Sequence, residues 1–319
     1  MRDARIGVVG ATGAVGGVVL ELLAERGFVN VRAFASARSA ATKLADGRVV
    51  EEATPDALLA GDLDLCLFSV GTRASKELVP HAHRGGAVCI DKSAAFRLAD
   101  GIPLVVPEVN GARALEHEGI LANPNCCAIP LALVLKPLHD AAGLRAVRVA
   151  TYQSASGAGA QRLQRLLDEP QAEHDLAMDW DYDGEEFEEE SKLRDETRKI
   201  LELPELPLSA TCVRVPVPVG HAESVWLETE DALAPEQARA LLSAAGSVRL
   251  EEFPTPAQAA GGDEALVGRI RRDRAAENGL SLFLACDNLR KGAALNGIQI
   301  AELVLTPLAA DRTAVSGPL

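Results

Sequence analysis

The stretch Ala4–Arg26 reads ARIGVVGATGAVGGVVLELLAER, and it decides the fold of the first part of the chain. Its first residues form an apolar run that ends at Gly10, which is typical of a buried β-strand, and residues 14–26 have the apolar periodicity of a helix. Gly10, Gly13 and Gly16 lie at the turn between the two segments. Glycines at such a turn let the backbone approach a pyrophosphate, which then binds at the N-terminus of the helix. The stretch therefore predicts a dinucleotide-binding unit.

The alternation of strands and helices continues beyond this stretch. Further strand-like runs occupy residues 31–35, 63–71 and 87–90, and a helical run occupies residues 75–85. This spacing predicts a parallel sheet with crossover helices, which is the arrangement of a Rossmann-type α/β domain. From about residue 145 the strand-like runs become longer and helices become fewer, so we expect a second, α+β domain with a mixed sheet.

Composition limits the classes of function. The chain has 319 residues and a formal net charge of −14, which argues against nucleic-acid binding as its main role. No segment approaches the roughly 18 uninterrupted apolar residues of a membrane span, so we expect no membrane partner. A strand-like run begins almost at the N-terminus, so we expect no signal peptide and a cytoplasmic location with reduced thiols. The six cysteines lack paired zinc-type spacing, so we expect no metal site.

The second strand-like run indicates which dinucleotide is bound. It is followed by Ser36, Arg38 and Ser39, with no acidic residue to hold a ribose 2′-hydroxyl. An arginine flanked by hydroxyl groups suits a 2′-phosphate, so we predict NADP rather than NAD. The alternative is an arginine exposed in a loop.

Two adjacent cysteines occur in NPNCCAIPL, residues 123–131. Asn125 is a good N-cap, so Cys126 is expected in the first turn of a helix, where the helix dipole lowers the pKa of a thiol. Backbone N–H groups of the same turn are expected to hold an oxyanion. Cys127 is expected to point about 100° away and to pack inward. The alternative reading of Cys126 is a buried residue that only fills space.

A histidine and an amide in the second half of the chain support a catalytic reading. His221 follows a proline-rich, strand-like run and is a candidate base, the alternative being a histidine with a purely structural role. Residues 151–160 offer Gln153 and several backbone N–H groups near a phosphate or nicotinamide. A thiolate, a base and a nicotinamide together indicate oxidation of an aldehyde through a thioester, which water or phosphate then cleaves.

The motifs together resemble those of the aspartate-semialdehyde dehydrogenase family over essentially the whole chain. The matching stretches are GATGAVG, SARSA, DKSAAFRL, NPNC, TYQSASGAG, EESKLRDETRKIL, RVPVPVGH, VGRIRRD and DNLRKGAALNGIQIAE. The resemblance implies NADP-dependent, phosphate-requiring interconversion of L-aspartate 4-semialdehyde and 4-phospho-L-aspartate. That reaction lies on the route to lysine, threonine, methionine and diaminopimelate.

The resemblance also implies roles for individual residues. Cys126 would be the nucleophile, His221 the general acid/base, and Gln153 the residue that orients the substrate. Arg214 would bind the substrate α-carboxylate and Glu189 its ammonium group, which suits the charges of these side chains. Incoming phosphate would be bound by Arg97 and Lys192. The predicted cofactor site comprises Gly10, Thr12, Gly13, Ala14, Val15, Gly16, Ser36, Arg38, Ser39, Ser156, Gly157 and Asn296.

The family's domain organisation is expected here as well. Residues 1–125 and 290–319 would form the NADP-binding domain, and residues 126–289 the catalytic and dimerisation domain of a homodimer or a dimer of dimers. Two rival interpretations remain. One is an N-acetyl-glutamyl-phosphate reductase, and the other is a non-catalytic protein on the same scaffold.

Four positions depart from the family pattern. Cys127 stands where the family usually has serine or threonine, and Ala41 replaces a usual glycine in the loop for the 2′-phosphate. Ser191 stands where a bulky residue is common, and Ala222 follows His221 where serine is frequent.

Overall fold

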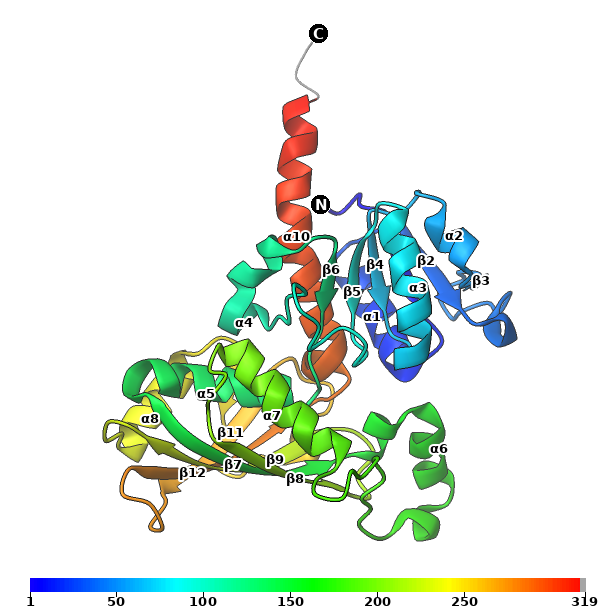
Figure 1. Ribbon diagram of the computed structural model, residues 1–319. Helices are drawn as coiled ribbons and strands as arrows, with labels where there is room; N and C mark the ends of the chain where they lie inside the picture. The colour runs from blue at the N-terminus through cyan, green and yellow to red at the C-terminus, as the bar shows by residue number, and fades with distance from the viewer. Residues whose placement is uncertain (316–319) are drawn as a thin grey trace. The chain divides into compact units, whose positions relative to one another are not determined.

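The computed structural model describes residues 1–315, except for the side chains of residues 172, 173 and 307–315. The chain divides into two compact units (Figure 1). Unit 1 comprises Met1–Pro124 together with the chain from Ala293 onward, and unit 2 comprises Asn125–Gly292. Within residues 1–315, no helix has both the length and the apolar character that a membrane crossing requires.

Unit 1 is built on a six-stranded sheet whose paired strands are all parallel. The strand order is β3-β2-β1-β4-β5-β6. The order changes direction beside β1, and dinucleotides bind at the carboxyl ends of the strands at such a point. The prediction of a Rossmann-type parallel sheet is therefore confirmed. The strands are β1 (Ile6–Val9), β2 (Val31–Ala35), β3 (Glu51–Glu52), β4 (Leu65–Phe68), β5 (Val88–Asp91) and β6 (Ile120–Ala122).

Helices cover both faces of this sheet, and each face has its own apolar core. Ile6 and Val8 belong to the core that includes residues of α1 and α10, whereas Val9 belongs to the core that includes α3. This alternation follows from the two-residue period of a strand. The helical elements of unit 1 are α1 (Ala14–Glu25), η1 (Ala37–Ser39), α2 (Pro55–Leu59), α3 (Thr72–Arg84), α4 (Pro107–Asn110), η2 (Gly111–Glu116) and α10 (Leu295–Val315).

Unit 2 is built on a six-stranded mixed sheet of order β10-β11-β12-β9-β7-β8, as the sequence predicts. Its two outermost pairs are parallel, and the pairs between them are antiparallel. The strands are β7 (Leu144–Gln153), β8 (Leu208–Arg214), β9 (His221–Thr229), β10 (Val248–Leu250), β11 (Ala265–Arg272) and β12 (Gly279–Cys286).

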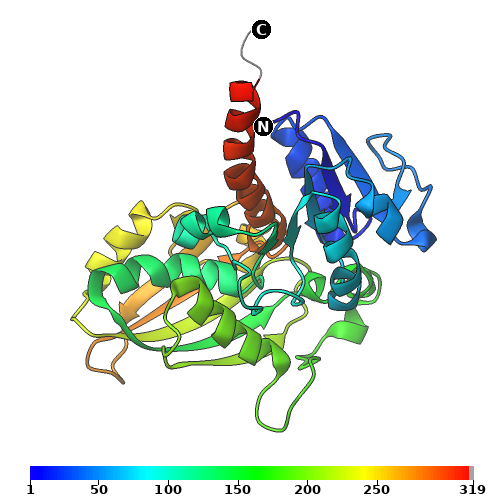
Figure 2. The same ribbon diagram turned by 45° about the horizontal axis from the view of Figure 1, so that its top comes forward.

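Figures 1 and 2 both show α5 and α7 side by side over one face of the mixed sheet. The helical elements of unit 2 are α5 (Ala128–Ala142), η3 (Ala155–Ala158), α6 (Ala160–Asp168), η4 (Pro170–Glu173), α7 (Glu188–Leu201), α8 (Pro235–Ala244) and α9 (Pro256–Ala259), with η5 (Arg290–Ala294) at the junction with α10.

The strand register determines which side chains share the covered face of the mixed sheet. Gln153 at the end of β7 lies opposite Arg214 at the end of β8. Thr151, two residues earlier on β7, lies opposite Glu223 on β9. Side chains at alternate positions of a strand point to the same face, so His221 and Glu223 share this face too. The fold therefore gathers polar side chains at the ends of three neighbouring strands.

Candidate active site

Cys126 differs from every other cysteine of the chain in its accessibility. It is partly exposed, whereas the other five cysteines are buried. Burial raises the pKa of the Cys66 thiol to about 12 and also raises the pKa values of Cys89, Cys127, Cys212 and Cys286. A buried thiol with a raised pKa is a poor nucleophile. Cys126 is therefore the thiol that a substrate can reach.

The turn that carries Cys126 is fixed by Asn125. The side-chain Oδ1 of Asn125 accepts a hydrogen bond from the backbone N–H of Cys127 at 2.7 Å, as an N-cap does two residues ahead. The regular helix α5 begins only at Ala128, so Cys126 lies in the turn before the helix rather than in its first turn. The expectation that the N–H groups of this turn hold an oxyanion is wrong for Cys127, because its N–H is already bonded to Asn125.

Asn125 also joins the turn to α7 and β7. Its Nδ2 donates to Oε1 of Glu189 at 2.9 Å, and its backbone N–H donates to Oε2 of Glu196 at 2.6 Å. The same Oε1 of Glu189 accepts from Nε2 of Gln153 at 3.1 Å. Sequence reasoning missed Glu196, although its position seven residues after Glu189 places both on one face of a helix. This buried network sets the place of the Cys126 turn against Gln153.

His221 is oriented by Ser154. The backbone N–H of Ser154 donates to Nδ1 of His221 at 3.0 Å, and the Ser154 hydroxyl lies 3.1 Å from the same atom. Because Nδ1 accepts a hydrogen bond, the neutral ring carries its proton on Nε2. Nε2 is buried and has no hydrogen-bond partner within the described part of the chain. His221 therefore presents an N–H donor to the site.

Asn288 holds the Ser154 segment in place, and sequence reasoning missed this residue. Its Oδ1 accepts from the hydroxyl groups of Ser154 and Ser156, each at 3.1 Å, and from the backbone N–H of Gly220 at 2.9 Å. Asn288 thus connects the Ser154 segment, which contacts Nδ1 of His221, to Gly220, which precedes His221 in the chain. The available signal was its place in the matching stretch 287–302.

The thiols and the imidazole form a compact cluster. The Sγ atoms of Cys126 and Cys127 and a ring nitrogen of His221 lie within 4.8 Å of one another. Cys127 therefore packs inward, as expected, but it remains beside the reactive sulfur. Histidine that binds a metal normally donates a hydrogen bond from its other nitrogen, whereas Nδ1 of His221 accepts one. The cluster is better suited to proton donation than to holding a metal.

Arg214 is buried beside Gln153. Its Nη1 donates to the carbonyl of Ser154 at 3.1 Å, and its guanidinium lies 4.6 Å from the centre of the Trp180 ring. Asp179 reaches its Nη2 at 3.4 Å, so an acidic residue from the block 168–190 pairs with this arginine instead of being only solvated. Arg214 is thus placed to bind a carboxylate bidentately.

The absence of a side chain at Gly157 allows η3 to lie close to the guanidinium of Arg214 and the imidazole of His221. A Cβ atom added there would lie 2.9 Å from Nη1 of Arg214 and 2.9 Å from Cε1 of His221, so a side chain at this position would displace one or both of them. Ser156 is buried and bonded to Asn288. Both residues were predicted to bind the cofactor, and they lie in unit 2, whereas the rest of the predicted cofactor site lies in unit 1.

The glycine turn of unit 1 fits a pyrophosphate. Gly10 has a φ of +92°, which favours glycine, and a Cβ added to Gly16 would collide with the carbonyl of Gly10. Gly13 caps α1 without a side-chain hydrogen bond, and the first turn of the helix contains no acidic residue. Thr12 and Gly13 are exposed, and Ala14 and Val15 are partly exposed. The turn therefore offers an open helix N-terminus to an anion.

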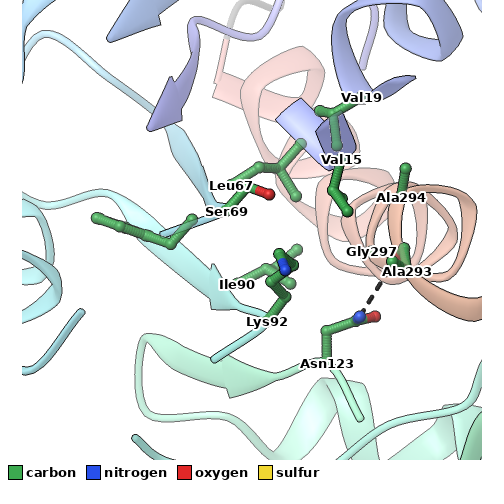
Figure 3. A pocket seen from close by; sticks show the side chains of 11 residues that line it. Val15, Val19, Leu67, Ser69, Ile90, Lys92, Asn123, Ala293, Ala294 and Gly297 are labelled. Atoms are coloured by element: carbon green, nitrogen blue, oxygen red, sulfur yellow. Dashed lines mark hydrogen bonds between the residues drawn. The ribbon is translucent and has the colours of Figure 1, made fainter. Parts of the chain in front are cut away.

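A small pocket lies next to this turn within unit 1 (Figure 3). Val15, Ser69, Lys92 and Asn123 are among the residues that line it. Asn296, predicted to bind the cofactor, is completely buried, and its Nδ2 donates to Oδ1 of Asn123 at 2.7 Å. Asn296 thus orients a residue that lines the pocket.

Comparison with known proteins agrees with this arrangement. Residues 5–117 match the family model "Semialdehyde dehydrogenase, NAD binding domain", and residues 135–291 match "Semialdehyde dehydrogenase, dimerisation domain". The aspartate-semialdehyde dehydrogenase of Streptomyces akiyoshiensis is 45% identical, with 95% of this chain and 99% of that protein covered.

This chain belongs to the aspartate-semialdehyde dehydrogenase family.

Solved structures give the same result. Aspartate semialdehyde dehydrogenase II of Vibrio cholerae, complexed with ASA, has a TM-score of 0.90 and 36% identity, covering 95% of this chain and 98% of that one. The Candida albicans enzyme with NADP has a TM-score of 0.76 and 25% identity, covering 94% and 98%. As a member of this family, the chain is an oxidoreductase with an NAD(P)-binding domain.

The loop after β2 carries the three residues that are predicted to bind the 2′-phosphate of NADP. Ser36 and Arg38 are exposed and Ser39 is partly exposed at η1, so all three are open to a ligand. Ala41, where the family usually has glycine, has a φ of +62°. That left-handed conformation strains any residue with a Cβ atom.

Replacing Ala41 with glycine is expected to stabilise the protein. Relief of the left-handed strain outweighs the entropy that glycine loses on folding, which leaves a gain of about 0.5 kcal/mol and a melting temperature about 1–2 °C higher. Ala40 is the matched control, because its φ of −61° suits alanine and Ala40→Gly should lower the melting temperature. An Ala41→Gly variant that melts below the parent would show that the strain at Ala41 is smaller than the entropy cost of glycine.

The two residues predicted to bind phosphate in this family member lie in different units. In unit 1, Nε of Arg97 donates to the carbonyl of Asn123 at 3.1 Å. In unit 2, Nζ of Lys192 pairs with Glu188 at 2.7 Å on the surface of α7. Their joint role in one phosphate site therefore stays a prediction.

Proposed function

We propose that this chain catalyses the NADP-dependent, phosphate-requiring interconversion of L-aspartate 4-semialdehyde and 4-phospho-L-aspartate. The observation that carries the proposal is the cluster in unit 2, where the one accessible cysteine lies beside His221. The substrate and cofactor named for the Vibrio cholerae and Candida albicans structures support the same assignment. A cytoplasmic location and a place in the synthesis of lysine, threonine, methionine and diaminopimelate go with this activity as predictions.

The charged residues around the cluster suit the substrate. Arg214 binds the α-carboxylate, which takes the place of Asp179 on the guanidinium. Glu189 accepts a hydrogen bond from the ammonium group, and its bonds to Asn125 and Gln153 hold it in position. The aldehyde carbon is then delivered to the sulfur of Cys126, which is the advantage that fixed binding groups give to an enzyme.

Covalent catalysis begins at Cys126. The thiolate attacks the aldehyde carbon, and the negative charge that develops on the aldehyde oxygen is stabilised by the N–H at Nε2 of His221. When bound, NADP supplies the hydride acceptor that takes the substrate from the aldehyde to the acyl level of oxidation. Phosphate, held by Arg97 and Lys192, attacks the resulting thioester and releases 4-phospho-L-aspartate together with the Cys126 thiolate.

Unit 1 is assigned as the NADP-binding domain, and unit 2 as the catalytic and dimerisation domain. The pyrophosphate binds the turn of Gly10, Gly13 and Gly16, and Arg38 with Ser36 and Ser39 binds the 2′-phosphate. The glycine geometry and the open end of α1 support this assignment.

We further infer a homodimer or a dimer of dimers formed through the sheet of unit 2. Its face opposite α5 and α7 carries Tyr152 and Phe283, whose ring centres lie 6.2 Å apart, and the partly exposed Trp226. Apolar residues gathered on an accessible sheet face are typical of an interface. Sedimentation velocity checks this: we expect a dimer or tetramer, and a Trp226→Glu variant should be monomeric.

The proposed activity is tested by formation of NADPH from aspartate semialdehyde, with and without phosphate. We expect turnover only when both aldehyde and phosphate are present. Turnover of N-acetyl-glutamate semialdehyde but not of aspartate semialdehyde would favour the reductase interpretation. NADP binding without turnover of either aldehyde would favour a non-catalytic protein.

Replacing Arg38 with alanine is expected to weaken NADP binding selectively. A charged hydrogen bond to the 2′-phosphate contributes about 1.5–3 kcal/mol, so the KM for NADP should rise by about 10- to 100-fold while that for NAD changes little. Arg84→Ala is the control, because Arg84 is exposed at the C-terminal end of α3. This end of the helix lies away from the carboxyl ends of the strands. Equal effects on NADP and NAD would remove the assignment of Arg38.

A further inference from the structure

A segment between α6 and α7 (Figure 1), residues 177–182, is tied down at both ends, and we call it the strap. At its start, the backbone of Ala177 exchanges two hydrogen bonds with the backbone of Arg214, at 2.7 and 3.0 Å. At its end, Tyr182 forms a single β-bridge with Phe187, and the centres of their two rings lie 5.0 Å apart. These contacts fix the strap on unit 2, next to Arg214.

Two neighbouring side chains of the strap contact the guanidinium of Arg214 in different ways. The centre of the Trp180 ring lies 4.6 Å from its Cζ atom, so the indole covers one flat face of the guanidinium. Oδ1 of Asp179 lies 3.4 Å from Nη2, at the edge of the same group. A cation over an aromatic face is stabilised by the ring quadrupole, and more strongly where water is excluded. The side chain of Arg214 is only 5% exposed, so its stack with Trp180 is of the stronger kind.

The remaining donors of Arg214 show where a carboxylate can bind. Nη1 is occupied, because it donates to the carbonyl of Ser154 at 3.1 Å. Nε is buried and has no hydrogen-bond partner within the described part of the chain. Nε and Nη2 form one edge of the planar guanidinium, and this edge can hold both oxygens of a carboxylate. Asp179 contacts only the Nη2 half of the edge, at 3.4 Å, whereas a strong charge-assisted hydrogen bond measures about 2.7–2.9 Å. Asp179 is therefore weakly held there.

Asp179 has a second cationic partner, which lowers the free-energy cost of leaving Arg214. Its Oδ2 pairs with Nη1 of Arg162 on α6. The side chain of Asp179 is also 28% exposed, so water reaches its carboxylate. Asp179 can therefore give up Nη2 of Arg214 without becoming a buried, unpaired charge.

We propose that the strap prepares Arg214 for the substrate: Trp180 positions the guanidinium, and Asp179 occupies its open edge until the substrate α-carboxylate replaces it. Trp180 keeps water from one face of the guanidinium and holds the edge formed by Nε and Nη2 in place. The incoming carboxylate takes both donors, and Asp179 remains with Arg162. Trp180 thus raises the affinity for the substrate, and Asp179 lowers it. The inference rests on the proposed function, because that function assigns the substrate carboxylate to Arg214.

The first test compares KM and kcat for aspartate semialdehyde in variants of the full-length protein. Trp180→Leu removes the stack and should raise KM by about 3- to 30-fold with little change in kcat, because the strap acts on binding. Trp180→Phe keeps an aromatic face and should restore most of the affinity. Asp179→Asn removes the competing carboxylate and should lower KM by about two- to fivefold. Changes of opposite sign at adjacent residues distinguish these roles from a general loosening of the strap, which would raise KM in both variants.

Two other residues of the strap supply matched controls. Asp181→Asn makes the same change of charge two residues away, where the residue is exposed and its backbone carbonyl accepts the hydrogen bond from Glu188. Tyr182→Leu removes an aromatic ring that packs on Phe187 rather than on Arg214. Both variants should keep the KM of the parent.

The second test requires no turnover and uses L-2-aminobutyrate. This amino acid has the length, the ammonium and the carboxylate of the substrate, but a methyl group replaces the aldehyde. Isothermal titration calorimetry should show the same order of affinities, with Asp179→Asn above the parent and the parent above Trp180→Leu. The control ligand is 1-aminopropane, which lacks the carboxylate, so any binding that it shows should not respond to either substitution.

Each result supports or overturns the proposal. A Trp180→Leu variant with the parent's affinity for L-2-aminobutyrate, or a Tyr182→Leu variant as weak as Trp180→Leu, would show that Trp180 does not position Arg214. A lower affinity in Asp179→Asn would show that Asp179 supports the site instead of competing for it. Failure of the parent to bind L-2-aminobutyrate would remove Arg214 as a carboxylate site, and the proposal with it. The predicted order of affinities in a protein that does not oxidise aspartate semialdehyde would refute the proposed function alone.

Discussion

Replacement of Cys126 with alanine is expected to lower turnover by at least about 10⁴-fold, because removal of a covalent nucleophile is the most damaging single change in such a site. The other five cysteines are buried, so none replaces it. NADP binding should be unaffected, since the glycine turn and Arg38 belong to unit 1 and Cys126 belongs to unit 2. The measurements are the rate of NADPH formation and a fluorescence titration with NADP.

Cys127 supplies the control for this experiment. Cys127→Ala removes a buried thiol next to the nucleophile, and its effect should be far smaller than that of Cys126→Ala. Mass spectrometry of the protein after incubation with aspartate semialdehyde and NADP, without phosphate, should find the acyl adduct on Cys126. An adduct on Cys127, or a Cys126→Ala variant with near-normal rate, would overturn the assignment of the nucleophile.

The sequence predicts those features that depend on local order along the chain. The strand, glycine turn and helix of residues 4–26 occur within one short segment, so their period and their glycines are enough to predict the first unit. Asn125 caps Cys127 from two residues away, and this contact too is visible in the local sequence.

Features that depend on strand register are not predictable in the same way. Gln153 and Arg214 are 61 residues apart, and they are neighbours because β7 and β8 pair in one particular register. A shift of one residue would turn every side chain of a strand to the opposite face. The burial of Glu223 is not predictable from the sequence for the same reason. A charged residue in a strand is expected to be exposed, and only the strand pairing shows that Glu223 is buried.

Residues 168–190, which hold much of the chain's excess of acidic side chains, illustrate a different limit. Their composition predicts a solvated segment, and most of them are exposed. Glu189 departs from this average because it is buried, and Asn125 and Gln153 donate hydrogen bonds to it. Composition describes a segment as a whole, whereas burial and hydrogen bonding belong to particular side chains.

Replacement of His221 with alanine is expected to lower turnover by about 10²- to 10³-fold, which is the effect of removing one donor to a developing oxyanion. The reason lies in Ser154, whose backbone N–H occupies Nδ1 and leaves the proton on Nε2. In this tautomer His221 is expected to donate to the aldehyde oxygen of the substrate. The N–H of Cys127 cannot substitute for it, because Asn125 accepts that hydrogen bond.

Two further variants separate a donor from a base at position 221. His221→Gln places an amide N–H near the position of Nε2 and should recover part of the rate lost in His221→Ala, whereas a general base would not be recovered by a neutral amide. Ser154→Ala removes only the hydroxyl and leaves the backbone N–H on Nδ1, so its effect should be several-fold smaller than that of His221→Ala. The contrary result has two parts: His221→Gln is as slow as His221→Ala, and the parent shows a rise of kcat with pH that both variants lack. That result would mean that His221 acts by accepting a proton. The tautomer inferred from Ser154 would then not be the catalytic one.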